Sequence, residues 1–481
     1  MTKYLTTIGL EFHAELKTNT KLFCSCPTAC TSNPNTNVCP VCLALPGALP
    51  VLNKRAVDLA IKAGLALNCE ISRYSQFDRK NYFYPDLPKS YQTTQLYQPI
   101  CTNGYIIIST KDGEKKIRIN RIHIEEDAGK LVHSGDTITS SNYSLADYNR
   151  AAVPLIEIVT EPDIASDEEA KEFAEQLRLI LLYAGVSDVK MEQGSLRCDV
   201  NISLRANEND PFGTKAEIKN LNSFKAVQRA ILYEENRQAD LLDSGGHVVQ
   251  ETRTFDDSSG KTSSMRSKGD SHDYRYFPDP DLVTTVVDDA WIEQIQQEIP
   301  EGPQERLNRL RKEHSLSDYD ARLLVEEPAL ALFFDQVIEH FDEPKMIANW
   351  LLGDLSRLLN DSEKDFETVP IKPKYLADLL QQVKNANINQ NSAKIVLEEL
   401  FYTDKTPTDI IEEKGFSQIS DTSSLEKAVK EAIAAHPQPV QDYRNGKKQA
   451  LGFLLGQIMK ATKGQANPQM VKKLLSEELN K

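Results

Sequence analysis

The chain has 481 residues, of which 40% are hydrophobic, so it is long enough for two or three domains that each bury a core. Its formal net charge of −15 argues against a protein that coats nucleic acid without specificity. No stretch approaches the roughly 20 apolar residues of a membrane span, and the N-terminal residues lack the pattern of a signal peptide, so we expect a cytoplasmic protein with no membrane partner.

The first predicted strand, residues 8–16, alternates between two faces. Apolar residues take the even positions, whereas Glu11, His13 and Glu15 share the opposite face. Alternation alone is common in antiparallel sheets that pack on one face. Carboxylates with an imidazole are a less ordinary choice for a solvated face, and they can hold Mg²⁺ or carry a proton.

Two short pairs of cysteines follow this strand. Cys24 and Cys26 form the first pair, and Cys39 and Cys42 form the second. Zn²⁺ binds four thiolates at tetrahedral corners, so this spacing predicts a zinc knuckle, in which Cys30 could replace one ligand. Buried thiols or a disulfide are the alternative.

A segment rich in aromatic and charged residues comes next, at residues 77–92, and includes Lys80, Tyr82 and Lys89. Aromatic rings beside basic groups can stack a nucleobase and hold phosphates. A proline-stiffened loop that covers the sheet explains the same composition. Residues 273–282 repeat this composition and leave the same two alternatives.

Four later segments repeat the polar face of the first strand. Their side chains are Glu125, Glu157, Arg197, Asp199, Glu217 and Lys219. A lone carboxylate is more often a surface charge or an ion-pair partner. Several strands with the same chemistry instead favour a face that binds Mg²⁺ and nucleotide phosphates together.

The sequence SSGKT at residues 258–262 resembles the end of a phosphate-binding P-loop. The loop also requires a glycine five positions before Gly260, where Phe255 stands. Any ATP must therefore be held in another way, and we expect a sheet face with basic contacts such as Arg266 and Lys268.

After residue 288 the apolar spacing becomes helical, and prolines punctuate the helical runs. Residues 444–481 carry eight Lys or Arg and two Asp or Glu, whereas the rest of the chain has a net negative charge. This stretch could attract phosphates, although a solvated helix face is an equally good explanation.

Nine motifs are distributed along the first 282 residues: IGLEFHAELKTNTK, PNTNVCPVCLALPGALPVLN, FDRKNYFYPDLPKSYQ, RIHIEEDAGK, PLIEIVTEPD, RCDVNISL, AEIKNLNSF, SMRSK and HDYRYFPDPDL. Together they resemble the B subunit of the aspartyl/glutamyl-tRNA amidotransferase, an enzyme that makes Gln-tRNA or Asn-tRNA from mischarged precursors. Members of that family usually have glycine where this chain has Ala44, and some lack the zinc cysteines, which implies a structural zinc.

The resemblance implies an α+β chain of three domains. Residues 1–290 would form a cradle domain with a mixed or antiparallel sheet, related to the glutamine synthetase fold and carrying the zinc knuckle at residues 24–42. Residues 291–405 would form an all-helical domain. Residues 406–481 would form a small helical tail that binds tRNA.

The resemblance also implies a reaction. ATP would phosphorylate the side-chain carboxylate of Glu-tRNA(Gln) or Asp-tRNA(Asn), and ammonia would displace the phosphate to leave an amide. Since the chain lacks an amidase-type glutaminase signature, ammonia would come from an A subunit, with a small C subunit completing a heterotrimer. The alternatives are a zinc-bearing adaptor that positions aminoacyl-tRNA for a partner, and a free-standing glutamine synthetase-like ligase.

Roles carry over from the family by position. Catalysis with Mg²⁺ would involve Glu11, His13, Glu125 and Glu157. ATP would be held by Arg197, Asp199, Glu217, Lys219, Arg266 and Lys268. Ammonia would arrive along Lys80, Tyr82 and Lys89, of which Lys80 and Tyr82 would also be catalytic. No role is assigned to Glu126, because the strand register decides which of Glu125 and Glu126 faces the site.

Overall fold

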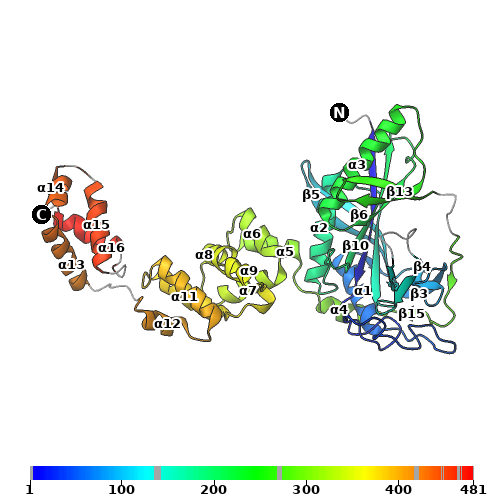
Figure 1. The fold of residues 1–481 in the computed structure, drawn as a ribbon, viewed down its shortest axis with the longest axis horizontal. Coiled ribbons are helices and arrows are strands. Elements are labelled where there is room, and N and C mark those ends of the chain that lie inside the picture. Colours follow the sequence, from blue (N-terminus) through cyan, green and yellow to red (C-terminus); the bar gives the residue numbers. More distant parts are fainter. Residues whose placement is uncertain are drawn as a thin grey trace. The chain divides into compact units, whose positions relative to one another are not determined.

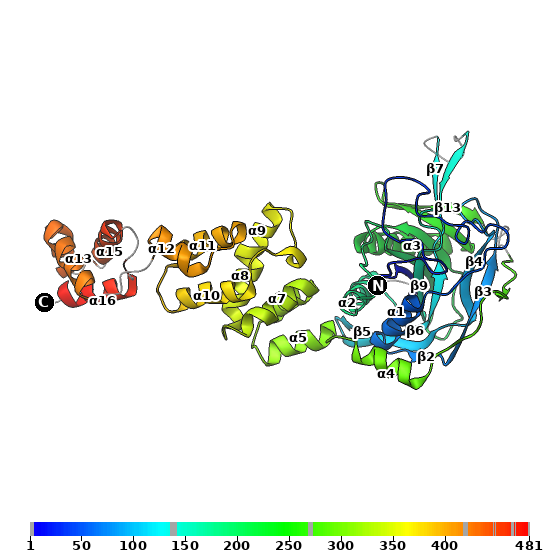
Figure 2. The same ribbon diagram turned by 90° about the horizontal axis from the view of Figure 1, so that it is seen from below.

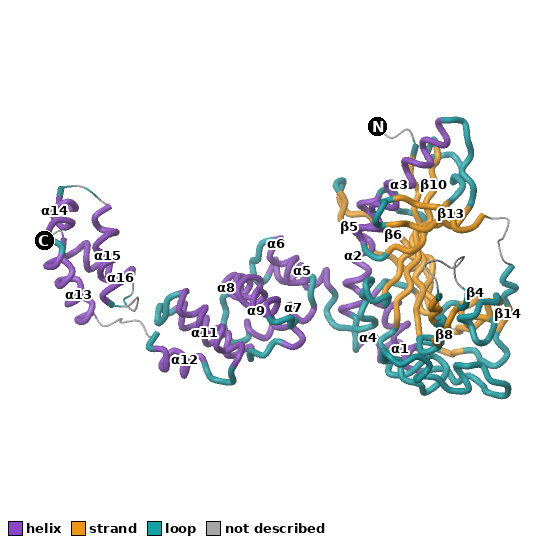
Figure 3. Tube along the Cα trace, viewed as in Figure 1, coloured by secondary structure: helices purple, strands orange, loops and turns teal. Residues whose placement is uncertain are grey.

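The computed structural model describes residues 4–134, 142–267, 273–416, 422–445, 447, 449–462, 466 and 468–479. The chain divides into two compact units, Met1–Pro303 and Gln304–Lys481. The first is built on a large sheet with helices, and the second is helical (Figures 1 and 3). The expected α+β class is therefore confirmed.

The large sheet of the first unit has nine strands in the order β13-β12-β11-β10-β1-β9-β6-β5-β2. Their bounds are β1 (Leu5–Glu15), β2 (Glu70–Ile71), β5 (Cys101–Thr110), β6 (Gly113–Glu126), β9 (Pro154–Thr160), β10 (Leu196–Arg205), β11 (Ala216–Leu221), β12 (Glu251–Asp256) and β13 (Lys261–Ser267). Strands β11 and β12 are parallel, whereas the other neighbours are antiparallel. The sheet is therefore mixed.

A smaller sheet packs beside the large one. Its strands are β3 (Tyr74–Asn81), β4 (Tyr91–Gln98), β14 (Phe277–Pro278) and β15 (Thr285–Val286). Side chains of β4 reach the edge of β6 beyond the point where β5 stops pairing with it: Gln95 Oε1 accepts from Ile124 N at 3.0 Å, and Gln92 Nε2 donates to Glu126 O at 2.9 Å. The end of β6 is consequently buried on both faces.

Two further strands, β7 (Lys130–His133) and β8 (Ser144–Asp147), form a hairpin that stands out from the first unit (Figure 2).

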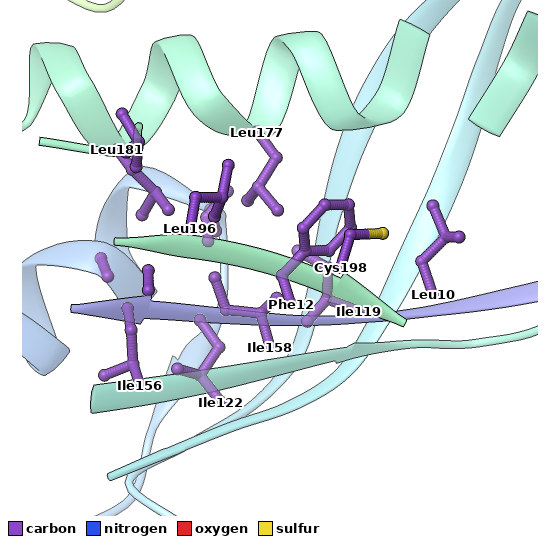
Figure 4. Packing of buried hydrophobic residues seen from close by; sticks show 14 of the residues in the cluster. Leu10, Phe12, Ile119, Ile122, Ile156, Ile158, Leu177, Leu181, Leu196 and Cys198 are labelled. Carbon is purple, nitrogen blue, oxygen red and sulfur yellow. The ribbon is translucent and has the colours of Figure 1, made fainter. Parts of the chain in front are cut away.

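Helices cover the apolar face of the large sheet, opposite the small sheet (Figure 1). They are α1 (Lys54–Ala66), α2 (Asp167–Tyr183), α3 (Phe224–Asp243) and α4 (Asp289–Gln297). The apolar even-numbered residues of β1, such as Leu10 and Phe12, are fully buried and pack near Leu177 and Leu181 of α2 (Figure 4). The alternation in β1 thus predicted the apolar face correctly.

The second unit is helical throughout its described residues. Its helices are α5 (Pro303–Lys312), α6 (Asp318–Val325), α7 (Pro328–Ile338), α8 (Pro344–Trp350), α9 (Ser356–Asp361), α10 (Pro373–Lys384), α11 (Gln390–Tyr402), α12 (Pro407–Lys414), α13 (Thr422–Ala435), α14 (Pro437–Arg444), α15 (Gln449–Ala461) and α16 (Pro468–Leu479). Prolines begin several of them because the first helical N–H has no partner to lose. Helices α13–α16 enclose a core of their own, which includes Leu425, Leu454 and Leu475. No described helix has the length and apolar composition to span a bilayer.

A buried carboxylate joins α3 to β12 and β13. Glu234 is fully buried, and it accepts from Arg237 Nη2 at 2.8 Å and lies 2.9 Å from Arg253 Nε. Burial alone would raise the pKa of Glu234, but the bonds from Arg237 and Thr262 and the charge of Arg253 lower it. A depressed pKa means that this carboxylate stabilises the fold above its unfolded pKa of about 4.3, and that the contribution is lost as the pH falls through the folded value.

We therefore expect Glu234→Gln to lower the free energy of unfolding at pH 7 by about 3 kcal/mol, because Arg237 and Arg253 both lose a buried carboxylate partner and Arg253 keeps only Glu251. Urea denaturation at pH 7 and at pH 4 would measure the effect, which should shrink at the lower pH. Asp240→Asn, at an exposed position of the same helix, is the control and should change little. An equal loss of stability at both pH values would contradict an electrostatic role for Glu234.

Candidate active site on the polar face of the sheet

Histidines and carboxylates meet where β1, β9 and β6 lie side by side. His13 is opposite Glu157 in the β1–β9 pair, and Glu157 is opposite His123 in the β9–β6 pair. The Nε2 atoms of His13 and His123 lie 3.4 Å and 3.1 Å from Glu157 Oε2. Glu125 Oε1 lies 3.4 Å from His13 Nε2. These four residues form the imidazole–carboxylate cluster.

In this cluster the histidines and the carboxylates stabilise one another's charged forms. Burial opposes protonation of His123, but the carboxylates of Glu157 and Glu125 outweigh it and raise the pKa of His123 to about 9. Burial likewise favours a neutral Glu157, yet His123 and His13 hold the pKa of Glu157 well below its usual value. Glu157 therefore stays ionised, although it is largely buried.

A second group, the acidic cluster, lies on the neighbouring strands β1, β10 and β11. It comprises Glu11, Asp199 and Glu217, and Glu11 is opposite Asp199 in the register. Lys219 Nζ lies 2.6 Å from Asp199 Oδ2 and 2.9 Å from Glu217 Oε1. Burial, followed by the charges of Glu157 and Glu217, raises the pKa of Glu11, so the two clusters interact.

Both clusters have the donor chemistry of a divalent-ion site. Ligand atoms of His13, Glu125 and Glu157 lie within 4.8 Å of one another, and those of the acidic cluster do as well. Carboxylate oxygens are the donors that Mg²⁺ prefers. The four residues expected around one Mg²⁺ therefore fall into two groups. His13, Glu125 and Glu157 lie together, whereas Glu11 lies with Asp199 and Glu217, which we expected to bind the nucleotide.

The Glu125–Glu126 doublet faces two directions. Glu125 joins the imidazole–carboxylate cluster, whereas Glu126 forms an ion pair with Lys89 and accepts from Thr93 N at 2.7 Å. Lys89 and Glu126 line a cavity of about 310 Å³ together with Cys24. The register thereby places Glu125 at the site and Glu126 at the cavity.

Aromatic rings lie beside the imidazole–carboxylate cluster. Tyr82 and Tyr274 pack edge to face with their centroids 5.9 Å apart, and Lys80 Nζ lies 5.8 Å and 5.2 Å from the two ring centroids. Burial, with the nearby charges of Asp86 and Glu125, raises the pKa of Tyr82. Packing of the rings against one another agrees with a loop that covers the sheet, one of the two alternatives for this segment.

The remaining expected basic residues have different surroundings. Arg197, opposite His13 in the register, donates to Asp127 Oδ1 at 3.0 Å, and Arg150 also pairs with Asp127. The backbone of Arg266 pairs with Thr252, but its side chain lies outside the described part of the chain. Lys268 lies outside it entirely.

Sequence reasoning did not assign His123, Asp127 or Arg150 to the site. His123 had a signal, because it shares the alternation face of Glu125. Asp127 stands in the motif RIHIEEDAGK, but neither Asp127 nor Arg150 had an alternation signal, since both lie in the loops that follow β6 and precede β9.

The four expected cysteines converge. Sγ atoms of Cys24, Cys26, Cys39 and Cys42 lie within 4.8 Å of one another. The Cys39 and Cys42 sulfurs are 3.9 Å apart, close to the ~3.8 Å between corners of a tetrahedron with 2.3 Å zinc–sulfur bonds. All eight cysteines are free thiols, and the exposed Cys30 is not part of the group. The donor set and its spacing fit zinc better than a disulfide.

Backbone and charge in the knuckle agree with this arrangement. A bond from Cys24, opposed by burial, and a backbone bond from Cys39 lower the pKa of Cys42 to about 5. Ala44, two residues later, has φ 54°, a left-handed conformation that glycine adopts more easily. Glycine, which the resemblance leads us to expect at this position, would adopt this conformation with less strain.

Comparisons with known proteins give consistent matches along the chain. Residues 6–293 match the family described as "GatB/GatE catalytic domain", and residues 332–479 match the "GatB domain". Proteins named as the B subunit of aspartyl/glutamyl-tRNA(Asn/Gln) amidotransferase are similar over their full length: those of Caldanaerobacter subterraneus and Carboxydothermus hydrogenoformans are 52% identical, and that of Caldicellulosiruptor saccharolyticus is 53% identical. Each alignment covers 100% of both chains.

Proposed function

Because the chain belongs to the family of aspartyl/glutamyl-tRNA(Asn/Gln) amidotransferase B subunits, we propose that it carries the ATP-dependent step of tRNA amidation. In this step the side-chain carboxylate of Glu or Asp, esterified to tRNA, accepts the γ-phosphoryl group of ATP. Ammonia then attacks the acyl carbon, the bond to the phosphate oxygen breaks, and an amide remains. The observation that carries the proposal is the pair of adjacent ionisable clusters on one polar face.

The chemistry requires such a face. An ionised carboxylate resists attack by ammonia until one oxygen becomes part of a phosphate leaving group. ATP and the substrate carboxylate are both anions, so their approach needs positive charge. Lys219 and Arg197 lie at the acidic cluster and beside His13, where they can contact phosphate oxygens. Mg²⁺ held by the two clusters would neutralise further charge on the phosphates.

Ammonia is proposed to reach this face from the cavity beside the cysteines. Lys89 and Glu126 line the cavity, and the next carboxylate along β6, Glu125, belongs to the imidazole–carboxylate cluster. Tyr82, with Lys80 beside its ring, lies near both glutamates of the doublet. The proposed route runs from Lys89 past Glu126 to Tyr82, at the end of β6. The source would be a glutaminase A subunit, with a C subunit completing the complex.

The proposal includes three further parts. Zinc in the knuckle would be structural, since its four cysteine ligands leave no open position. The cradle would be related to the glutamine synthetase fold, with Arg266 and Lys268 at the nucleotide. The helical tail would bind tRNA, and the protein would act in the cytoplasm.

The test uses the purified complex with ATP, Mg²⁺, glutamine and either Glu-tRNA(Gln) or Asp-tRNA(Asn). We expect amidated aminoacyl-tRNA, and ATP cleavage that falls to background when mischarged tRNA is omitted. Amide formation on free glutamate or aspartate would instead support a glutamine synthetase-like ligase. ATP cleavage that does not respond to mischarged tRNA would contradict the proposed reaction.

A further inference from the structure

Arg121 lies on the polar face of β6, two residues before His123. A β-bulge interrupts the pairing of β6 with β9 between Ile119 and Arg121. Ile119 and Ile122 are both buried in the core, although a regular strand places residues three apart on opposite faces (Figure 4). The bulge absorbs the extra residue, so that Asn120 and Arg121 share the polar face. Their side chains are in contact, since Arg121 Nη1 donates to Asn120 Oδ1 at 3.4 Å.

The strand register places Arg121 beside both clusters. Val159 of β9 is opposite Arg121 on one side and opposite Glu11 on the other, so Arg121 and Glu11 lie in one row across the sheet. Neighbouring strands are about 4.8 Å apart, which puts the backbones of these two residues roughly 10 Å from each other. Along β6, His123 is the next residue on the face of Arg121. An anion bound between the clusters would therefore lie within reach of the long Arg121 side chain.

The guanidinium of Arg121 keeps unused bonding capacity. Among the described residues no carboxylate forms an ion pair with it, and its buried Nε has no hydrogen-bond acceptor. The nearby Glu161 is bonded to Asn120 instead, at 2.6 Å. By contrast, Arg197 and Lys219 of the same face are each held by carboxylates. A buried donor without an acceptor is unfavourable, so Arg121 gains on turning its N–H groups to an anion on the polar face.

The positive charge of Arg121 acts at the same place as the carboxylates of the imidazole–carboxylate cluster. Tyr276 packs edge to face on Tyr274, with ring centroids 6.0 Å apart. Burial, then Tyr274 and the two glutamates of the cluster, raise the pKa of Tyr276, whereas Arg121 opposes the rise. This agrees with the register, which puts Arg121 and the cluster on one face.

We propose that Arg121 binds the γ-phosphoryl group of ATP as it passes to the substrate carboxylate. The inference rests on the proposed function and names a residue for it. In this step the bond from the γ-phosphorus to the β,γ-bridging oxygen breaks, ADP leaves, and a carboxylate oxygen takes the phosphoryl group. Negative charge is spread over the outer oxygens of that group, and a guanidinium can donate two parallel N–H bonds to them. The row shared with Glu11 favours phosphate, because Mg²⁺ at the acidic cluster would hold the phosphates there.

The first test measures binding and needs no turnover. The purified complex with Mg²⁺ is titrated with ADP and, separately, with β,γ-imido-ATP, which carries a third phosphate that is not transferred. Arg121→Gln removes the charge and keeps an amide that can contact Asn120. We expect this variant to bind β,γ-imido-ATP about 10- to 100-fold more weakly than wild type, because a charge-assisted hydrogen bond is lost, and to bind ADP as wild type does.

The second test follows tRNA-dependent ATP cleavage. Arg121→Gln should lower kcat by about 100- to 1000-fold and leave the KM for mischarged tRNA unchanged. Arg121→Lys keeps the charge without the paired N–H groups, so it should recover part of both losses, and it covers the case in which the glutamine variant does not fold. Arg118→Gln is the matched control and should equal wild type, since Arg118 is an exposed residue of the same strand and pairs with Asp163.

Equal affinity of wild type and Arg121→Gln for β,γ-imido-ATP would overturn the phosphoryl contact. An equal loss for ADP and β,γ-imido-ATP would also overturn it, because that is the result expected of a disturbed fold. A raised KM for mischarged tRNA with unchanged nucleotide affinity would move Arg121 to the substrate carboxylate and overturn the inference.

Failure of the proposed function gives a different pattern. Wild type that binds β,γ-imido-ATP but cleaves ATP without regard to mischarged tRNA would contradict the proposed reaction, while the binding comparison would still decide the role of Arg121. Wild type that binds neither nucleotide would overturn both.

Discussion

Replacing Glu125 by alanine should lower tRNA-dependent ATP cleavage by roughly 100- to 1000-fold while the complex still assembles. Glu125 is almost fully buried, and its Oε1 lies 3.4 Å from His13 Nε2, in a group with the donor set of a divalent-ion site. Without it the proposed metal site would lose one charged ligand, and the histidines would lose a counter-charge. ATP cleavage and amide formation would be measured at saturating Mg²⁺, ATP and mischarged tRNA.

Glu114→Ala is the matched control for this change. Glu114 lies on the same strand, β6, but at its exposed end, so its loss should leave turnover unchanged. Glu11→Ala tests the acidic cluster in the same assay and should give a loss of similar size. Near-normal turnover in Glu125→Ala and Glu11→Ala, with only tRNA binding altered, would contradict the catalytic role and favour an adaptor.

Removal of residues 422–481 should weaken tRNA binding by about a hundredfold near 0.1 M salt, because basic residues on phosphates supply much of such affinity. The cut spares α12, which packs on α11 and carries the buried Ile410 and Ile411. Helices α13–α16 have their own core, so their loss exposes no other one. Binding of labelled tRNA to the complex measures the effect, and the glutaminase activity of the partner should be unchanged.

Two exposed lysines allow a milder version of this experiment. Lys472 and Lys473 are adjacent on α16 and exposed. Replacing both by alanine should weaken binding less than the deletion does and should make the dependence of affinity on salt shallower by about one unit of slope per lost contact. Unchanged tRNA affinity in the deletion would remove the tail from the tRNA interface and favour packing on a partner subunit.

Local pattern was sufficient to predict much of the first unit. The period of two in β1 assigned Leu10 and Phe12 to the core because strand side chains alternate whatever their neighbours are. Asn53 and Ser166 accept hydrogen bonds from backbone N–H groups at the starts of α1 and α2, and residues of this type before a helix can be recognised from the sequence alone. Such signals depend only on residues close in the sequence.

What could not be predicted depends on pairing between distant strands. His123 meets His13 only because β9 lies between their strands and places Glu157 opposite both. Tyr274 reaches Tyr82 because β14 pairs with β3, almost 200 residues away in the chain. The direction of Glu126 followed from the register of β6, which alternation alone leaves open.

The opposite directions of the Glu125 and Glu126 side chains limit which sequence changes β6 can accept without disturbing the proposed site. The end of β6 separates the proposed active site from the cavity, because Glu125 lies at the site and Glu126 lines the cavity. Substitutions in the strand can be accommodated one by one, but gaining or losing a single residue before the doublet would exchange the two glutamates between compartments. The number of residues in β6 before Glu125 therefore matters more for the proposed site than the identity of the other residues in the strand.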